Sequence, residues 1–297
     1  MFAKTEFVLP GHDTMQRKLL RTMLYMLLAA IALVYLFPLI VVVLTSVKTM
    51  EDINTGSLLS LPAHPTLEPW HAAWSQACVG LRCEGVNGYF QNTFVMVIPA
   101  VAISTIVGAL NGYLLTQWRF RGADLAFALI LFGCFIPYQI VLIPMARALG
   151  WLHLARSITG LIVVHVCFGI AFTTMFFRNY LITLSPDLVN AAKVDGARFF
   201  TIFFRIIVPI SVPCFMVCLI WQFTNIWNDF IFGATFTSGD NSPITVALNN
   251  VVNTSTGERP YNIHMATVLI TAAPTLLVYV FAGKYFMRGL MAGSVKG

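Results

Sequence analysis

The sequence predicts an all-α integral membrane protein, and three observations lead to that fold class. Only 10% of the 297 residues are charged, whereas a soluble domain carries about 25%. Hydrophobic residues make up 58% of the chain. The charges are also clustered, and they leave six apolar stretches, each longer than the roughly 18 residues that a transmembrane helix candidate needs. These observations exclude a disordered chain and argue against an ordinary soluble globule.

The six predicted spans follow from counting residues between successive charges. They are residues 22–47, 85–118, 125–146, 157–177, 206–228 and 260–283. Residues 241–257 also lack charge, but their Asn, Ser and Thr side chains are costly to place unpaired in hydrocarbon, so this stretch is predicted to be a loop. Prolines in or beside the spans are expected to cause local kinks only: Pro38, Pro99, Pro137, Pro144, Pro209, Pro213 and Pro274.

The basic residues predict the orientation of the spans. With the N-terminus inside, the outer segments hold only Lys48, Arg82, Arg147, Arg156 and Arg259 of the 18 Lys and Arg residues. This bias predicts a cytoplasmic N-terminal tail over residues 1–21 and a cytoplasmic C-terminal tail over 287–297. The net charge of +6 then needs no nucleic-acid partner, only a membrane. A cleaved signal peptide is the alternative for residues 1–47, but its apolar region would run about 7–15 residues.

The first outer loop, residues 48–84, is expected to fold as a cap. Cys78 and Cys83 lie within it, on the side where thiols oxidise readily, and a disulfide is favoured over two free thiols. Such a bridge would stabilise the protein by roughly 2 kcal/mol. His64 and His71 lack the spacing of a zinc site, so no metal is expected. The other four cysteines lie in spans and are predicted to be small buried residues: Cys134, Cys167, Cys214 and Cys218.

The long inner loop, residues 178–205, carries the most specific signal. The local sequence predicts a short helix over residues 186–195. Ser185 can cap it, Pro186 suits its first position, Asp187 suits its first turn, and Gly196 suits the left-handed stop. Its Leu188, Ala191, Ala192 and Asp195 would share one face. A second helix over 197–205, with Phe199, Phe200, Phe203 and Phe204 around its axis, would lead straight into the fifth span. The short helix is either a docking element or an amphipathic connector on the membrane surface.

The spacing in this loop resembles the EAA loop of binding-protein-dependent ABC importer permeases. The chain has Asn190-Ala191-Ala192, then Gly196 after three residues, then Ile206-Ile207-Val208-Pro209 after nine more. Asn190 stands where the family has an acidic residue, which removes one expected ion pair. The resemblance implies a type-1 permease domain over residues 85–286. It also implies that an ATPase contacts Asn190, Ala191, Ala192, Asp195, Gly196, Ala197, Arg198, Phe199 and Phe200.

Other segments are similar to carbohydrate-import permeases of the maltose-permease second-subunit type. These are Ile136-Pro137 with Gln139 and Pro144, the segment from Trp227 to Phe230, and the C-terminal tail. The resemblance implies that the tail contacts the ATPase dimer through Gly293, Ser294, Val295, Lys296 and Gly297; a frayed terminus is the alternative. The loop 235–259 corresponds to an element that probes the sugar-binding protein, or is an ordinary polar loop. The loop with Cys78 and Cys83 is locally similar to glucose/mannose-type permeases.

No phosphate-binding loop of the form G-x-x-x-x-G-K-[ST] occurs in the sequence. ATP hydrolysis, with its Mg²⁺, is therefore expected in separate polypeptides, and no cofactor is expected in this chain. The partners that the resemblance implies are a homologous second permease subunit, two cytoplasmic ATPase subunits and a periplasmic or lipid-anchored sugar-binding protein.

Polar residues inside the spans are candidates for a sugar pathway, although each alone more often forms an interhelical hydrogen bond. The preferred set combines amide and aromatic groups that suit a neutral sugar: Gln139, Trp221, Gln222, Asn225, Trp227 and Asn228. Asn111, Tyr138 and His165 are weaker candidates, and His165 stands alone in its span. Asp229 lies about 35 Å above the inner end of span five at 1.5 Å per residue, which places it at the outer interface and argues against a proton relay.

The sequence therefore predicts a bacterial inner-membrane permease subunit of a sugar importer, with glucose or mannose, or another carbohydrate or polyol, as cargo. Two other functions were weighed. A secondary transporter would need buried ionisable residues and often half-repeats, and the sequence shows neither a buried carboxylate nor an evident repeat. An integral-membrane enzyme would need convergent His, Asp or Glu residues, which the six scattered histidines do not supply.

Overall fold

The computed structural model describes residues 14–118, 120–253 and 259–292. Throughout these ranges the ordered elements are helical, and the only strand-like feature is an isolated bridge between Val79 and Arg82. Four helices are long and apolar enough to cross a membrane: α1 (Thr14–Ser46), α4 (Asn87–Gln117), α7 (Ile158–Leu181) and α14 (Tyr261–Ala292). The predicted all-α membrane fold is confirmed.

The other two predicted spans are broken helices. In the third, α5 (Ala123–Phe135) and α6 (Tyr138–Trp151) meet at 102°. In the fifth, the helical run Phe199–Ile210 meets α11 (Val212–Trp227) at 79°. That run consists of α9 (Phe199–Ile202), a π-helical turn (Phe203–Ile207) and α10 (Val208–Ile210). The number of spans is therefore six if each bent pair counts as one.

Proline chemistry explains both breaks. Pro137 forces the preceding Ile136 into an extended conformation (ψ 121°), which ends α5. Pro209 and Pro213 flank Ser211 and each remove one backbone N–H from the helical ladder. The expectations of local kinks, and of a second inner helix leading straight into span five, are wrong at these two places, because the chain turns a corner instead.

The prediction of a loop over residues 241–257 is also partly wrong. Its first half forms α13 (Ile244–Asn253), preceded by the short helices α12 (Ile231–Phe236) and η2 (Gly239–Asn241). Ile244, Val246, Ala247 and Val251 of α13 are buried. The helix is amphipathic, so the polar residues that argued against a membrane span lie on a surface helix.

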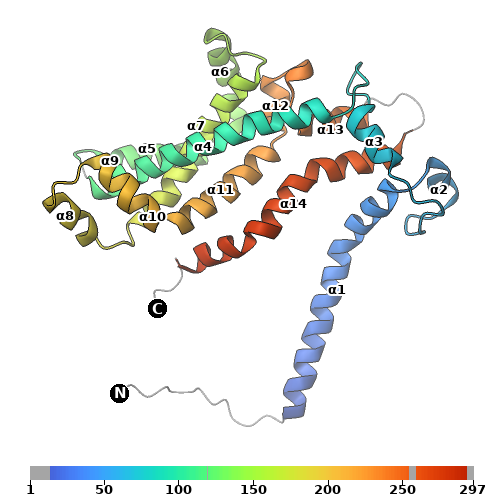
Figure 1. Cartoon of the computed structure of the whole chain (residues 1–297), viewed down its shortest axis with the longest axis horizontal. Helices are drawn as coiled ribbons and strands as arrows, with labels where there is room; N and C mark the ends of the chain where they lie inside the picture. The colour runs from blue at the N-terminus through green and yellow to red at the C-terminus, as the bar shows by residue number, and fades with distance from the viewer. Residues whose placement is uncertain (1–13, 119, 254–258, 293–297) are drawn as a thin grey trace.

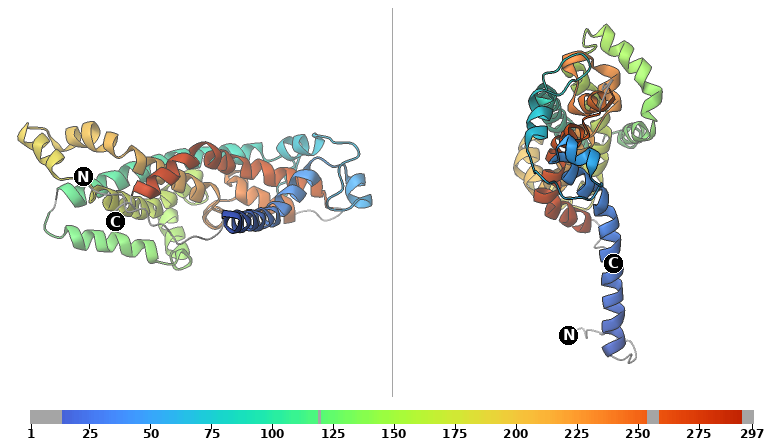
Figure 2. Two further views of the ribbon diagram at one scale, coloured as in Figure 1. Left: turned by 90° about the horizontal axis from the view of Figure 1, so that it is seen from below. Right: turned by 90° about the vertical axis from the view of Figure 1, so that its right-hand side faces the viewer.

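The helices form an elongated bundle with two distinct ends (Figure 1). The inner-loop helices α8 (Asp187–Val194) and α9 lie at one end. The opposite end, here called the cap end, carries α2 (Met50–Thr55), α3 (Glu68–Ser75) and α13. Helix α1 leaves the bundle at the cap end and projects away from it, as Figure 2 also shows. Within the membrane-competent part of α1, none of the most apolar window is buried.

Helices α4 and α7 pack closely because small residues line their contact. Ser104, Gly108 and Gly112 recur at every fourth position of α4 and are buried. A Cβ atom on Gly108 would lie 2.1 Å from Thr173 Oγ1, and one on Gly112 would lie 2.6 Å from Phe177 Cβ. Thr173 Oγ1 donates a hydrogen bond to the Ser104 carbonyl across the interface at 2.8 Å. This is the small-residue packing by which membrane helices approach closely.

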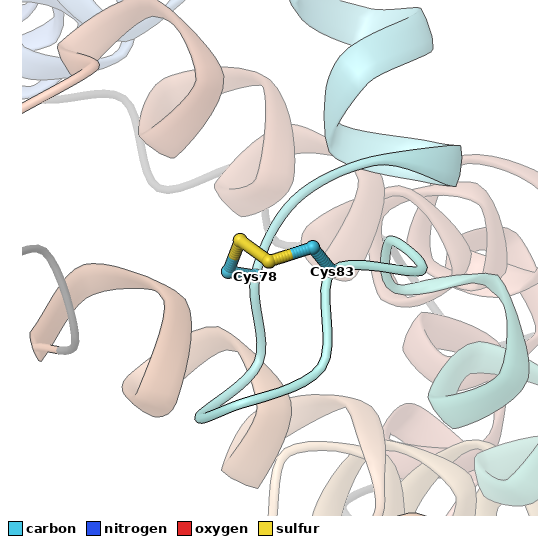
Figure 3. The surroundings of a disulfide bond; sticks show 2 residues. All are labelled: Cys78 and Cys83. Carbon is cyan, nitrogen blue, oxygen red and sulfur yellow. A yellow bond between two sulfur atoms is a disulfide. The ribbon is translucent and has the colours of Figure 1, made fainter.

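A folded cap covers the end of the bundle opposite α8. A disulfide joins Cys78 and Cys83 in a short hairpin (Figure 3). Arg82 of this hairpin forms an ion pair with Asp240, in the segment between α12 and α13. The buried Lys48 Nζ donates hydrogen bonds to the Ser57 carbonyl and Ser60 Oγ, both at 3.1 Å. The cap is thus tied to itself and to the bundle by polar contacts between distant parts of the chain.

Candidate functional site

Two features of the structure bear on function: the α8 end of the bundle and a cavity near the middle of α7. Helix α8 forms where its local sequence predicts it. The Ser185 hydroxyl accepts a hydrogen bond from the Asp187 N–H at 3.2 Å. Gly196 adopts φ +79°, in the left-handed region that ends helices at glycine. The Ala197 N–H then returns to the Ala192 carbonyl at 2.9 Å. The short helix and its glycine stop are confirmed, with each boundary one residue inside the predicted one.

One face of α8 is anchored to the bundle. Val189 is 2% exposed and packs in a cluster with Tyr113, Phe177 and Ile202. Lys193 Nζ donates a hydrogen bond to the Gln117 carbonyl at 3.1 Å and lies 4.3 Å from the centroid of the Trp118 ring. The two anchors hold α8 against the end of α4 and were not identified in the sequence. Their signal was the spacing of Val189 and Lys193, four residues apart on one helical face.

The opposite face of α8 is free in this chain. Leu188 and Val194 are exposed, at 48% and 87%, and so are Asn190 and Ala191. Asp195, Gly196, Arg198 and Phe200 continue this exposed surface beyond the helix. Ala192, Ala197 and Phe199 are partly buried instead. Ala192 therefore does not share the exposed face with Leu188 and Ala191, because the side chain turns towards the cluster around Val189.

An aromatic cluster connects the α8 end to the bundle. Phe199 lies with its ring centroid 4.8 Å from that of Tyr113 and 5.5 Å from that of Trp118. Phe203 is buried against the same tyrosine, whereas Phe200 and Phe204 are about 60% exposed. The segment that follows α8 is therefore packed against the C-terminal end of α4.

The cavity has a volume of about 280 Å³ and lies between the continuous helix α7, the end of α11, the short helix α12 and the α5–α6 break. Gly133, Ile136 and Tyr138 come from the α5–α6 break, and Phe232 comes from α12. Helix α7 contributes a strip at its middle, and α11 contributes residues from its last two turns. Aromatic rings form much of its wall, because Phe172 stands 4.7 Å from Trp221 and Phe168 stands 4.9 Å from Phe232, centroid to centroid.

Three of the six residues proposed for a sugar pathway line this cavity: Trp221, Gln222 and Asn225. Gln222 is almost fully buried, and its Nε2 donates a hydrogen bond to Ser104 Oγ on α4 at 2.7 Å. Asn225 is exposed, and its Nδ2 donates to the Trp221 carbonyl at 2.8 Å. Gln222 therefore joins two helices, as polar groups in spans usually do, while the Asn225 side-chain oxygen stays available.

The other three proposed pathway residues do not line this cavity, and their role in a sugar pathway stays a prediction. Trp227 is completely buried, and its ring N–H donates to the Thr271 carbonyl of α14 at 2.9 Å. Asn228 Oδ1 accepts a hydrogen bond from Thr275 Oγ1 at 3.5 Å. Gln139 is exposed and is not among the residues that line the cavity. Helical phase separates Trp227 from Trp221, and sequence alone did not show which face of α11 meets α14.

His165 and Asp229 form a pair that the sequence did not predict. The structure places His165 Nε2 3.8 Å from Asp229 Oδ2, with side chains 5% and 18% exposed. His165 is thus not alone, and the chain does contain a largely buried carboxylate. Asp229 also begins α12, because its carboxylate oxygens accept hydrogen bonds from the Phe232 and Gly233 N–H groups at 3.3 and 3.1 Å. His165 Nε2 has no hydrogen-bond partner among the described residues.

The remaining sequence expectations concern the two tails and the outer loop. The predicted tail contacts at Gly293, Ser294, Val295, Lys296 and Gly297 lie outside the described residues. In the loop 235–259, Asp240 pairs with Arg82, and its carbonyl accepts a hydrogen bond from Asn92 Nδ2. The first part of this loop is therefore fastened to the disulfide hairpin and to α4.

Comparison with known proteins places this geometry among transport components. The family described as "binding-protein-dependent transport system inner membrane component" matches residues 8–289. A probable ABC transporter permease protein of Pyrococcus horikoshii is 38% identical over 278 residues, which cover 93% of this chain and 98% of the relative. A xylose/arabinose import permease protein of Haloferax volcanii is 34% identical, and the match covers 86% of this chain and 87% of the relative.

A solved structure has the same fold. It is the crystal structure of a bacterial ABC transporter involved in the import of the acidic polysaccharide alginate. The matching chain has a TM-score of 0.80 at 20% sequence identity, and the match covers 94% of this chain and all of that one. At this identity the likeness concerns the fold alone.

Proposed function

We propose that the chain, which belongs to the family of inner membrane components of binding-protein-dependent transport systems, couples ATP-driven movement of α8 to sugar translocation. It is a sugar ABC importer permease subunit and not an enzyme. The observation that carries this proposal is the two-sided character of α8. Val189 and Lys193 fix one face to α4, and Leu188, Ala191 and Val194 leave the other face exposed and largely apolar.

A partner ATPase is the proposed occupant of that exposed face. Small or apolar side chains at Leu188, Ala191 and Val194 allow close approach, and Arg198 and Asp195 add charges beside them. Asn190 is exposed next to this surface and contributes no charge. The tail residues Gly293 to Gly297 are proposed to contact the same ATPase dimer. This arrangement has the α8 end and both chain termini in the cytoplasm.

The cap end is the proposed contact surface for the sugar-binding protein. The disulfide hairpin and the loop 235–259 are joined there by the Arg82–Asp240 ion pair. A homologous second permease subunit completes the transmembrane pathway, and two cytoplasmic subunits bind ATP and Mg²⁺. On this proposal, nucleotide-driven closure of the ATPases moves α8 and, through the Phe199–Tyr113 contact and the corner at Ser211, opens the pathway alternately to each side.

The proposed cargo is a neutral sugar. The local resemblance of the cysteine loop favours glucose or mannose, whereas relatives carry names for xylose/arabinose, arabinooligosaccharide and diacetylchitobiose transport. No single sugar follows from these names. The proposal is therefore restricted to the class, and another carbohydrate or polyol of the same importer type fits it equally.

Substitution of Gly196 tests the coupling proposal. Proline requires φ near −65°, whereas this residue has φ +79°, so Gly196→Pro should break the link after α8 and reduce ATP-coupled sugar uptake at least tenfold. Gly196→Asn is the matched control, since asparagine tolerates the left-handed region. Uptake would be measured in proteoliposomes that hold the full complex and its binding protein. Wild-type uptake in the Gly196→Pro complex would rule the coupling role out.

A further inference from the structure

We propose that the cavity between α7, α11 and the α5–α6 break is a binding site for one neutral sugar ring, and that Asp229 excludes sugar acids from it. This inference rests on the proposed function and assigns a substrate class to one site within this chain. The proposed site consists of an aromatic wall, a set of polar acceptors and a single carboxylate.

The size of the cavity limits the ligand. A volume of about 280 Å³ is just below the usual range of ligand pockets, which run from roughly 300 to 1,000 Å³. One pyranose or furanose ring fits such a space, whereas an oligosaccharide would have to extend beyond it. The site would therefore hold a monosaccharide or a single unit of a longer chain.

The wall of the cavity suits the apolar face of a sugar ring. Trp221 and Phe172 form an aromatic pair with ring centroids 4.7 Å apart, and both line the cavity. Tyr138 reaches it from the α5–α6 break and contacts Phe232 at 5.9 Å. Large aromatic rings give contact area with little loss of side-chain freedom, and a hydroxyl or amide beside them fixes the orientation of a ligand.

The polar groups of the cavity mostly accept hydrogen bonds, which suits a ligand rich in hydroxyl donors. Asn225 uses its Nδ2 within the chain, and no hydrogen bond of its Oδ1 occurs in the described part of the chain. The Asp229 carboxylate accepts two backbone N–H groups of α12, and a carboxylate has about four lone-pair sites. The Ile231 N–H is a third backbone partner of this carboxylate, so about one site remains for a ligand hydroxyl.

The charge of the cavity decides between neutral and acidic sugars. Asp229 is the one acidic side chain among the lining residues, and no Lys or Arg is present among them. A ligand carboxylate entering this space would meet the like charge of Asp229, which is a repulsive element of specificity. His165 also lines the cavity, but its Nε2 is buried 3.8 Å from Asp229 Oδ2 and is not open to a ligand carboxylate.

D-Glucose and D-glucuronate provide a matched pair of probes, since they differ only in the carboxylate at C6. Equilibrium binding of each radiolabelled sugar, and of D-xylose, would be measured on the full complex in nanodiscs without the binding protein. We expect glucose or xylose to bind at least about tenfold more tightly than glucuronate. Asp229→Asn should bring glucuronate to within about threefold of glucose, because asparagine keeps the helix cap but removes the charge.

Substitutions of two tryptophans test the aromatic wall. Trp221→Leu should weaken neutral-sugar binding about tenfold, whereas Trp151→Leu, at an exposed position outside the cavity, should leave it unchanged. Equal binding of glucose and glucuronate by the wild type, no binding of either neutral sugar, or no effect of Asp229→Asn would overturn the assignment. ATP-coupled uptake that still depends on Gly196 would show that the coupling function stands on its own.

Discussion

Asn190 shows how little a single exposed residue of α8 contributes to the fold and how much it could contribute to docking. It lies on the solvent side of the helix, one residue from the buried Val189. The neighbouring Arg198 and Asp195 are exposed as well. A change of charge at Asn190 therefore acts on a partner surface and leaves the packing of this chain untouched.

We expect Asn190→Glu to tighten docking of the ATPase. An exposed ion pair contributes about 0.2–1 kcal/mol, so the affinity should rise by at most about fivefold and the gain should disappear at high salt. Titration of the permease complex with the purified ATPase at low and high ionic strength would measure this. Asn190→Gln, without a charge, is the control. A gain that is insensitive to salt would contradict the electrostatic explanation.

The close packing of α4 against α7 leaves no room for a side chain at Gly108. A Cβ atom at this position would lie 2.1 Å from Thr173 Oγ1 and 2.8 Å from the Thr173 carbonyl carbon. We expect Gly108→Val to cost roughly 1–3 kcal/mol, as overpacked cores do, and to lower the unfolding temperature of the purified complex. In Gly283→Ala the added methyl group meets no atom of the described residues within 4 Å, so that variant should unfold like the wild type. Equal unfolding temperatures for all three proteins would show that α4 and α7 separate easily.

Helix α8 forms a separate unit of the structure because few contacts attach it to the rest of the bundle. Val189 provides an apolar anchor, and Lys193 provides a polar one through the Gln117 carbonyl and the Trp118 ring. The chain after it passes through the π-helical turn Phe203–Ile207 and bends by 79° at Ser211. On the coupling proposal, a corner of this kind would convert a displacement of α8 into a change of angle at α11, whereas a continuous helix would transmit an axial push.

Removal of the polar anchor should weaken coupling more than stability. Lys193→Met loses one hydrogen bond and one cation–π contact, together roughly 1–2 kcal/mol of local anchoring. We expect the sugar molecules imported per ATP hydrolysed to fall about threefold or more. Lys193→Arg can still reach a carbonyl and an aromatic face, and it should retain most of the coupling. The ratio would be measured in proteoliposomes, and an unchanged ratio in Lys193→Met would exclude a mechanical role for this anchor.

At the scale of the whole molecule, helix α1 presents a long apolar surface that the rest of the described chain does not cover. Helix α1 meets the bundle at its C-terminal end, where Thr45 and Ser46 are buried and the Lys48 carbonyl accepts a hydrogen bond from Asn262 at 3.0 Å. The rest of α1 is apolar and exposed, with Leu24, Leu28 and Tyr35 all more than half exposed. Apolar surface of this extent is typical of a helix that packs against lipid or another subunit.

We expect α1 to pack against the second permease subunit. A photo-crosslinking amino acid at Leu28 or Tyr35 should give an adduct with that subunit in the assembled complex. The same group at Leu81, which is fully exposed on the disulfide hairpin at the cap end, should not. Adducts with lipid alone at both α1 positions would show that this helix does not contribute to the interface.

The sequence predicted the parts that depend on local chemistry. Long charge-free stretches identify the spans because hydrocarbon excludes charge, and Ser185 and Gly196 delimit α8 because their conformational preferences are intrinsic. The sequence did not predict that Val189 and Lys193 anchor the helix, because their contacts depend on what α4 presents to them. The breaks at Pro137 and Ser211 were misjudged as kinks, because proline removes a hydrogen bond locally but neighbouring helices decide how far the chain turns.

The composition and spacing of this chain thus determined that it spans a membrane and which loop resembles an ATPase contact. Only the tertiary structure decided which polar residues share a cavity. Trp221 and Trp227 lie six residues apart on one helix, yet one lines the cavity and the other is buried against α14. His165 and Asp229 are 64 positions apart in sequence and meet at 3.8 Å. Contacts between distant segments depend on helix packing, which no local pattern encodes.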